Sequence, residues 1–344
     1  MVRPTDLRRR TRFVQALAFS HSSDTSPALR RAMTMSVYFL TWVLLTVLAP
    51  LWLPVTFVVG VFRRRSFIIL RLLSFFWTFL LIEGMGLFAA GIIHLITPGN
   101  RERRETLMFK LECWWGSTIF RWLCRFLSLS VSIEGDEQIL PGPLLVFIRH
   151  ASIIDTAVPV SFISNTKGLR LRYVFKRELL VDPCIDVAGH ASPNYFIDRA
   201  GQPAEELAGI RGLAENLGEQ GVLLYPEGTR FTKRKQKIAL KRLAKTHPEL
   251  AETAASFRHC LPPKLGGVLT LLDAAPDTDV LIVAHRGLEG MAEVTDLLSG
   301  SVVGKNVRVS FWRIRGEDIP QGEARRQWLF DLWKRVDDFV EAGA

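Results

Sequence analysis

Two long apolar segments near the start of the chain restrict its fold more than any other feature. Residues 36–62 contain no charged side chain, and residues 72–96 contain only Glu83 and His94 as ionisable groups. Each segment is longer than the roughly 20 helical residues that cross a bilayer core of about 30 Å. Pro50 and Pro54 interrupt the first segment, so it is predicted to form either a kinked span or a re-entrant hairpin as readily as a straight helix.

Glu83 allows two interpretations, because a carboxylate inside an apolar segment is costly unless it has a use. It is either a functional intramembrane carboxylate, or a structural group that faces a partner helix or carries a proton. The sequence leaves both open.

Basic residues are concentrated in the same part of the chain. The whole chain has 44 Lys and Arg against 34 Asp and Glu, a net charge of +10. Residues 1–125 hold 17 Lys and Arg and 6 Asp and Glu, so this part carries +11 and the rest of the chain carries −1. Cations next to apolar segments favour anionic lipid headgroups, and we therefore expect membrane lipids and no nucleic acid as partners.

The chain is predicted to have three parts: a basic polar tail over residues 1–34, a membrane-associated helical region over residues 35–128, and an α/β domain over residues 129–344. Residues 105–128 mix Trp and Phe with Lys and Arg, which is typical of an interfacial helix or of a helix packed on the domain. The start of the chain is a poor match to a cleaved signal peptide. We expect a membrane location, the bacterial inner membrane or its equivalent. A shallow helix pair would keep every basic cluster, and the catalytic domain, on the cytoplasmic side.

Four cysteines, at positions 113, 124, 184 and 260, form no C-x-x-C pair and no ligand-like group with histidine. This pattern predicts neither a disulfide framework nor a bound metal, and it fits a reducing compartment.

The second half of the chain has the pattern of an α/β fold. Short apolar runs at 143–148, 171–175, 221–225 and 279–284 are continuous rather than alternating, which predicts strands covered on both faces. Helical spacing appears between Pro203 and Gly218 and again over 322–341. We therefore expect a central, mostly parallel or mixed sheet flanked by helices and preceded by an N-terminal helical membrane anchor.

Each apolar run leads directly into polar residues, which begin at Arg149, Lys176, Glu227 and His285. Ligands of open α/β sheets bind beyond the carboxyl ends of the strands. The sequence therefore places its charged groups where a site would form.

His150 and Asp155 have the chemistry of a general base and its orienting carboxylate. A positioned base is worth on the order of 10²–10⁴ in rate, and a carboxylate on the other ring nitrogen fixes the tautomer. On a regular helix, side chains five residues apart point about 140° away from each other. The pair can therefore meet only if His150 precedes a helix that begins near Ser152, as the Ser152-x-x-Asp155 capping pattern allows. Alternatively, Asp155 serves only that cap.

A turn with phosphate-binding chemistry follows the third apolar run: Tyr225-Pro226-Glu227-Gly228-Thr229-Arg230. Pro and Gly favour a turn, Thr229 and Arg230 supply donors, and an Arg can grip a phosphate with two hydrogen bonds. A solvated surface turn is the alternative. Arg199 either contacts phosphate as well or pairs with Asp198.

Seven Lys and Arg residues lie between positions 233 and 245. They form either a solvated helix face or a surface that meets a membrane or the phosphates of a cofactor.

These motifs resemble those of the glycerolipid acyltransferases, specifically the 1-acylglycerol-3-phosphate acyltransferase family, over roughly residues 130–300. Four elements occur in the order of that family: His150-x₄-Asp155, Lys176-x-Glu178-Leu179, Phe196-Ile197-Asp198-Arg199 and Tyr225 to Arg230. Leu261-Pro262-Pro263-Lys264 resembles the branch that includes eukaryote-type lysophospholipid acyltransferases. Arg149 stands where many members have Asn, and Ile282-Val283-Ala284-His285 lacks the proline common in the fourth motif of the family.

The resemblance implies an enzyme that moves a fatty acyl group from an acyl thioester to the free hydroxyl of 1-acylglycerol 3-phosphate (lysophosphatidic acid), giving phosphatidic acid in phospholipid synthesis. It implies His150 as the base and Asp155 as its orienting group. It implies that Arg199 and Arg230 hold the phosphate, with Glu227, Gly228 and Thr229 in the same pocket and Lys176 and Lys264 as secondary candidates.

The same resemblance implies no bound cofactor and no metal, with acyl-CoA or an acyl carrier protein as co-substrate. Two alternatives remain. The acceptor is another lysophospholipid or glycerol 3-phosphate, or the chain is a membrane-anchored binding or scaffold protein.

Overall fold

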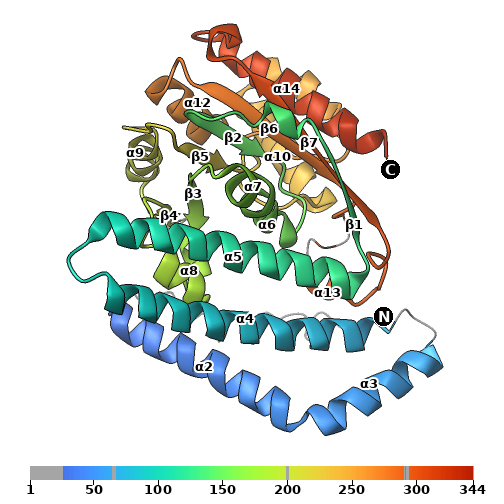
Figure 1. Ribbon diagram of the computed structural model, residues 1–344. Coiled ribbons are helices and arrows are strands. Elements are labelled where there is room, and N and C mark those ends of the chain that lie inside the picture. Colours follow the sequence, from blue (N-terminus) through green and yellow to red (C-terminus); the bar gives the residue numbers. More distant parts are fainter. Residues whose placement is uncertain (1–25, 64–66, 199–200, 290, 292–293, 344) are drawn as a thin grey trace.

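The computed structural model describes residues 26–63, 67–198, 201–289, 291 and 294–343 (Figure 1). Seven strands form one sheet in the order β1-β7-β6-β2-β5-β3-β4. Their bounds are β1 (Ser130–Glu134), β2 (Leu144–Ile148), β3 (Leu171–Lys176), β4 (Tyr195–Ile197), β5 (Gly221–Leu224), β6 (Asp279–Arg286) and β7 (Asn306–Ile314).

The sheet is mixed, as predicted. Neighbouring strands are parallel except for β6 and β7, so β1 and β7 run against the other five. The four apolar runs of the sequence form β2, β3, β5 and β6. The prediction omits β1, β4 and β7. The longest of these, β7, alternates buried residues such as Val307 and Val309 with the more polar Arg308, which differs from the continuous apolar pattern of the central strands.

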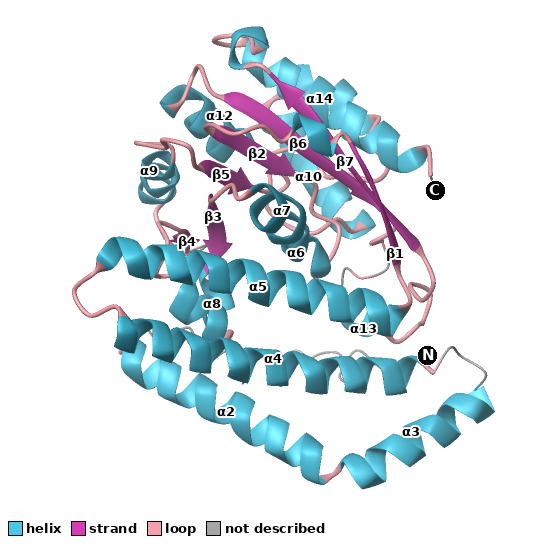
Figure 2. Cartoon of the chain, in the orientation of Figure 1, coloured by secondary structure: helices cyan, strands magenta, loops and turns pink. Residues whose placement is uncertain are grey.

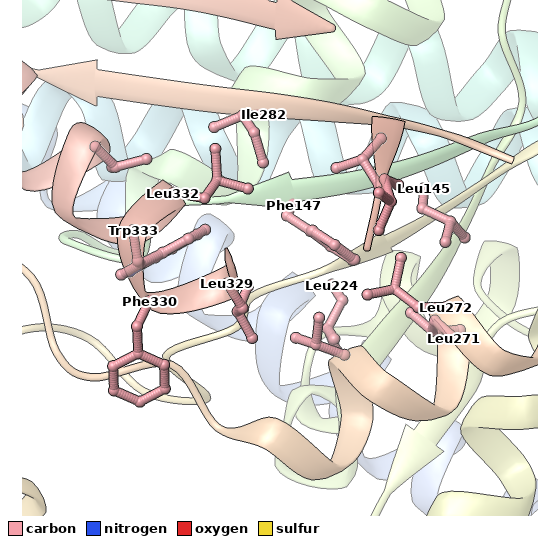
Figure 3. Close-up of a cluster of buried hydrophobic side chains, with 14 of the residues drawn as sticks. Leu145, Phe147, Leu224, Leu271, Leu272, Ile282, Leu329, Phe330, Leu332 and Trp333 are labelled. Carbon is pink, nitrogen blue, oxygen red and sulfur yellow. The ribbon is translucent and has the colours of Figure 1, made fainter. Parts of the chain in front are cut away.

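Helices cover both faces of the sheet (Figure 2). Alternate residues of β2 point to opposite faces: Leu145 and Phe147 lie in a first core, and Val146 and Ile148 lie in a second. Figure 3 shows the first core, which packs the sheet against α12 and α14. The helices of this face are α9 (Pro203–Leu213), α10 (Lys233–Thr246), α11 (Ala251–Ala255), α12 (Leu265–Ala274) and α14 (Ala324–Glu341).

The second core packs the other face of the sheet against α5 (Arg101–Leu127), through Phe120, Leu123 and Leu127, and against the irregular helical segment that follows Asp155. That segment consists of a 3₁₀ turn (Ile154–Thr156), α6 (Ala157–Pro159), a π-helical turn (Val160–Ser164) and α7 (Asn165–Lys167). The shorter elements of the domain are α8 (Pro183–Ala188), α13 (Val294–Leu297) and 3₁₀ turns at Asp136–Gln138, Arg177–Val181, Pro248–Leu250 and Gly316–Asp318.

The N-terminal helices form a separate layer below α5 in Figure 1. They are α2 (Pro27–Val47), α3 (Ala49–Arg63) and α4 (Ile68–Ile96). The first apolar segment is not a straight helix, because α2 and α3 meet at 70° next to Pro50, and both the kinked span and the re-entrant hairpin fit this bend. Among the described residues, α4 is long and apolar enough to cross a membrane, and α2 and α3 pass the same test together. Their outer surface is apolar, with Phe62, Phe88 and Leu95 more than 70% exposed.

The first helix begins earlier than the predicted end of the tail. Ser26 caps α2 and Pro27 occupies its first turn, so residues 27–34 are helical, whereas the remainder of the tail lies outside the described residues. Arg30 and Arg31 contact the buried carboxylate of Asp186 in α8, with nitrogen–oxygen distances of 2.9 and 3.2 Å. These ion pairs connect α2 to α8 of the α/β part of the chain. The three-part division of the chain stays a prediction.

Glu83 faces a partner helix, which was the structural alternative. Its side chain is 1% exposed and accepts a 2.7 Å hydrogen bond from the indole of Trp115 in α5. Helix α5 is thus part of the interface between the anchor and the domain, while Trp114 and Trp122 remain more than a third exposed.

The first core predicts a large loss of stability when Phe330 of α14 is truncated. Its ring is fully buried, so Phe330→Ala leaves a cavity that costs about 3–5 kcal/mol. Urea denaturation in detergent micelles, followed by circular dichroism, measures this loss. Asp331→Ala on the exposed side of the same helix is the control, and an equal loss in both variants would contradict the proposed packing.

Candidate active site

The candidate site lies at the carboxyl ends of three adjacent parallel strands. His150 follows β2, Tyr225 follows β5, and His285 lies near the end of β6. Strands β5 and β6 both pair with β2 in parallel, so these ends meet at one edge of the sheet. This is the edge at which the sequence predicted a site.

His150 and Asp155 are in contact. The Nδ1 atom of His150 lies 3.2 Å from each carboxylate oxygen of Asp155. The carboxylate is fully buried and the imidazole is 7% exposed. Because an ionised carboxylate only accepts hydrogen bonds, Nδ1 carries the hydrogen and Nε2 keeps the lone pair that a base needs.

Asp155 also forms the predicted cap, in addition to its contact with His150. Its Oδ2 atom accepts hydrogen bonds from the backbone N–H groups of Ala151 (2.7 Å) and Ser152 (2.8 Å). In return, the hydroxyl of Ser152 accepts one from the backbone N–H of Asp155 at 3.1 Å. The chain between positions 150 and 154 is not helical, and therefore the ring of His150 can turn back onto the carboxylate.

The surroundings of Asp155 favour its ionised form. Burial alone raises the pKa of a carboxyl group. The hydrogen bond and charge of His150, the charge of His285 and the backbone N–H of Ser152 outweigh burial and lower the pKa of Asp155 below its ordinary value.

Glu227 connects the second motif to the first. One of its carboxylate oxygens accepts the backbone N–H of His150 (2.9 Å), and the other accepts that of Leu261 (2.8 Å). The side chain is 1% exposed, and its burial raises its pKa to about 7. Both oxygens are therefore used to hold the backbone, which fits a bracing role for Glu227.

Gly228 provides the turn that the motif needs. Its φ of +65° lies in the left-handed region, and a Cβ atom at this position would be 2.9 Å from Nζ of Lys264. The backbone N–H of Lys264 donates to the carbonyl of Pro226 at 2.8 Å. Lys264 therefore lies against the turn, and its role as a secondary phosphate contact stays a prediction.

Arg230 is held next to His150 through the backbone. The N–H of the following residue, Phe231, donates to the carbonyl of His150 at 2.9 Å. The hydroxyl of Thr229 accepts a hydrogen bond from Lys235 at 3.1 Å, and so does the carbonyl of Arg230 at 3.2 Å. The half-buried guanidinium of Arg230 has no carboxylate partner within the described ranges, which leaves its donors open to a ligand.

Arg199 lies outside the described residues, so the structure does not place it. The preceding residue, Asp198, pairs with Arg177 at 2.9 Å. Lys176 ends β3 at the same edge of the sheet, where it is paired in register with Ile197 of β4. The structure thus brings His150, Asp155, Glu227, Gly228, Thr229, Arg230 and Lys264 together and leaves Arg199 untested.

Two residues of the site, Arg149 and His285, received no role from the sequence. Arg149 is fully buried and donates from Nη1 to the carbonyl of His285 (2.8 Å) and from Nη2 to that of His259 (3.0 Å), and it pairs with Glu289. The Nε2 atom of His285 lies 2.9 Å from the carbonyl of Arg149 and 3.8 Å from Oδ2 of Asp155. Burial lowers the pKa of His285, as does the nearby charge of Arg149, against the opposing charge of Asp155. The sequence signal that could have identified them is their position, because Arg149 follows β2 and His285 lies near the end of β6.

Comparisons with known proteins agree with this architecture. A family model described as Acyltransferase matches residues 130–284, a range that includes His150, Asp155 and Arg230. The mouse (Mus musculus) protein 1-acyl-sn-glycerol-3-phosphate acyltransferase gamma is 28% identical over 171 residues, which is 48% of this chain and 44% of the mouse protein. The chain thus spans less than half the length of that relative.

The fold resembles a solved structure as well. The crystal structure of PlsC, the 1-acyl-sn-glycerophosphate (LPA) acyltransferase from Thermotoga maritima, matches with a TM-score of 0.50 and 16% identity, covering 77% of this chain and 98% of that chain. At this identity the likeness concerns the fold alone. The chain thus contains, over residues 130–284, a domain that matches the acyltransferase family model.

Proposed function

We propose that this chain transfers a fatty acyl group from an acyl thioester to the free hydroxyl of 1-acylglycerol 3-phosphate, giving phosphatidic acid in phospholipid synthesis. One observation carries the proposal. The His150–Asp155 pair and the Arg230 turn share a backbone hydrogen bond, which sets a base beside a cation with open donors. The names of the mouse and Thermotoga maritima proteins support the same acceptor.

The proposed chemistry uses Nε2 of His150 as the base. The acceptor oxygen attacks the thioester carbonyl carbon while its proton passes to Nε2. The C–S bond then breaks, and the leaving thiolate takes that proton from the imidazolium. Asp155 holds the ring in the required tautomer and stabilises its positive charge during the step.

The acceptor phosphate is assigned to Arg230 and Arg199, with Thr229 as a further donor and Lys176 and Lys264 as secondary contacts. A guanidinium that is half-buried binds a phosphate more strongly than a fully solvated one, because less water competes for its hydrogen bonds. Glu227 and Gly228 shape the turn without needing to touch the ligand. The half-buried cation at Arg230 therefore supports a phosphate-bearing acceptor over a neutral lipid.

The apolar surface of α2, α3 and α4 supports action at a membrane, where both the acceptor and the product are dissolved. We place the catalytic domain on the cytoplasmic side, where soluble acyl thioesters are available. Either acyl-CoA or an acyl carrier protein serves as the donor in this proposal.

Acyl transfer by membranes that contain the chain tests the proposal directly. Lysophosphatidic acid, other lysophospholipids and glycerol 3-phosphate are offered in parallel with a labelled acyl thioester. The proposal expects the fastest transfer to lysophosphatidic acid. Faster transfer to another acceptor would replace that acceptor assignment, and transfer to none of them would favour a scaffold role.

Removal of the base is expected to reduce kcat by about 10²–10⁴-fold, because general-base catalysis contributes that factor. His150→Ala and His150→Gln should both show the loss, while the KM for the donor changes little. Ser161→Ala, a buried substitution in the same helical segment but outside the site, is the matched control. Retained transfer by both His150 variants, in protein with a native circular dichroism spectrum, would end the catalytic assignment.

Arg230→Ala is expected to raise the KM for lysophosphatidic acid by about 10–100-fold, because a charge-assisted phosphate contact is worth about 1.5–3 kcal/mol. A monoacylglycerol, which has no phosphate, should lose little with the same variant. Steady-state kinetics with both acceptors measures the difference. An equal loss for the two acceptors would argue against phosphate binding by Arg230.

The pKa of Asp155 predicts how stability depends on pH. A carboxyl group whose pKa is lower in the folded than in the unfolded chain stabilises the fold above its unfolded pKa of about 3.9 and loses that effect as the pH falls towards the folded value. Asp155→Asn should therefore be less stable than the parent at pH 7, with a difference that shrinks below about pH 4. Denaturation in micelles at several pH values measures this, and a difference that stays constant would contradict the ionised pair.

A further inference from the structure

The exposed face of α10 is a cationic surface that the proposed active site does not use. The helix contains seven Lys and Arg residues and no Asp or Glu. Residues 126–344 carry a charge of −1 with these seven cations and therefore −8 without them. Six of the seven are exposed and form no ion pair within the described residues: Lys233, Arg234, Lys237, Lys241, Arg242 and Lys245.

The opposite face of α10 is firmly packed. Leu243 is buried in the first core and Leu240 packs against it. The side-chain amide of Gln236 donates to the carbonyls of Phe257 (2.8 Å) and Cys260 (3.3 Å). Because this face is fixed, Lys237, Lys241 and Lys245, which are spaced four residues apart, are held in one row on the outside. We call these three residues the α10 row. Ile238 lies next to it and is 58% exposed.

The helix starts at the candidate active site. Thr232 caps it, and the preceding residue, Phe231, bonds to the carbonyl of His150. Lys235, in the first turn, donates to the hydroxyl of Thr229. From Lys233 to Lys245 the helix extends for about 18 Å. An anion bound along α10 would therefore lie within about this distance of the start of the helix at the site.

The location of α10 favours a soluble anion over a lipid headgroup. The N-terminal helix α4 contributes Ile68, and α5 contributes Phe120 and Leu123, to the second core. Helix α10 contributes to the first core, on the other face of the sheet. Helix α10 thus packs on the face of the sheet opposite to the face that packs against α4 and α5.

We propose that the α10 row binds the phosphates of an acyl-CoA donor, an inference that rests on the proposed function. The arm between the sulfur and the first phosphate of coenzyme A has the length of about four extended residues, or ~14 Å. When the thioester is held at His150, the arm is therefore long enough for the phosphates to reach the cations of α10. The exposed cations of the α10 row have the charge opposite to that of the phosphates. Ile238 offers an apolar surface to the adenine ring.

The variant K237E/K241E/K245E tests this inference with three donors: acyl-CoA, acyl-dephospho-CoA and acyl-pantetheine. The KM for acyl-CoA should rise about tenfold, since each exposed charge pair contributes modestly. The rise should be smaller for acyl-dephospho-CoA and absent for acyl-pantetheine, while kcat and the KM for the acceptor stay unchanged. The parent KM for acyl-CoA should also increase with added salt, and that of the variant should not.

The matched control is K237R/K241R/K245R, which keeps the charges and should bind like the parent. Calorimetric binding of coenzyme A to the full chain in micelles gives a readout that does not require acyl transfer, and the acidic variant should bind at least fivefold more weakly. Unchanged acyl-CoA kinetics and unchanged coenzyme A binding would overturn the inference. A loss confined to an acyl carrier protein donor, or to binding of anionic vesicles, would also overturn it.

The two proposals fail in different ways. If the parent transfers acyl groups from acyl-pantetheine, and the acidic variant has the same KM for acyl-CoA as the parent, only the α10 assignment fails. If the parent transfers acyl groups from no donor but coenzyme A binding still depends on the row, only the proposed function fails.

Discussion

The site depends on the hydrogen bonds that the carboxylate of Asp155 accepts. This carboxylate is fully buried, and it contacts the ring of His150 as well as the backbone N–H groups of Ala151 and Ser152. A buried charge is tolerated only when such donors replace the lost water. The same donors fix the loop after β2 and start the helical segment that follows. One group therefore both shapes the loop and sets the direction of the imidazole, so the local fold and the proposed chemistry cannot be separated.

A second buried carboxylate extends this arrangement to the Arg230 turn. Glu227 holds the backbone of His150 and of Leu261, and fully buried Arg149 joins the carbonyls of His285 and His259. Segments far apart in the sequence are thus tied together by hydrogen bonds between side chains and backbone. The Arg230 turn is positioned relative to His150 by the contacts of Glu227 and by the backbone hydrogen bond from Phe231 to His150. Catalytic groups need this kind of support from surrounding residues.

The sequence was sufficient for the central strands and for the edge of the sheet where the candidate site lies. Continuous apolar runs predicted β2, β3, β5 and β6, and the polar residues at their ends predicted the site. The bend between α2 and α3 had to be left among alternatives, because proline allows several geometries. Edge strand β1 and its neighbour β7 carry a mixed pattern, and the roles of Arg149 and His285 depend on contacts between residues more than a hundred positions apart, which spacing along one chain does not reveal.

The protonation of the His150 ring tests the central claim most directly. Nitrogen NMR of the chain labelled on its seven histidines, with His150 assigned from the spectrum of His150→Gln, distinguishes the two neutral tautomers. The account predicts a hydrogen on Nδ1 and a lone pair on Nε2 at neutral pH, with a loss of this preference in Asp155→Asn. A ring that carries its hydrogen on Nε2, or one whose tautomer does not respond to Asp155→Asn, would contradict it.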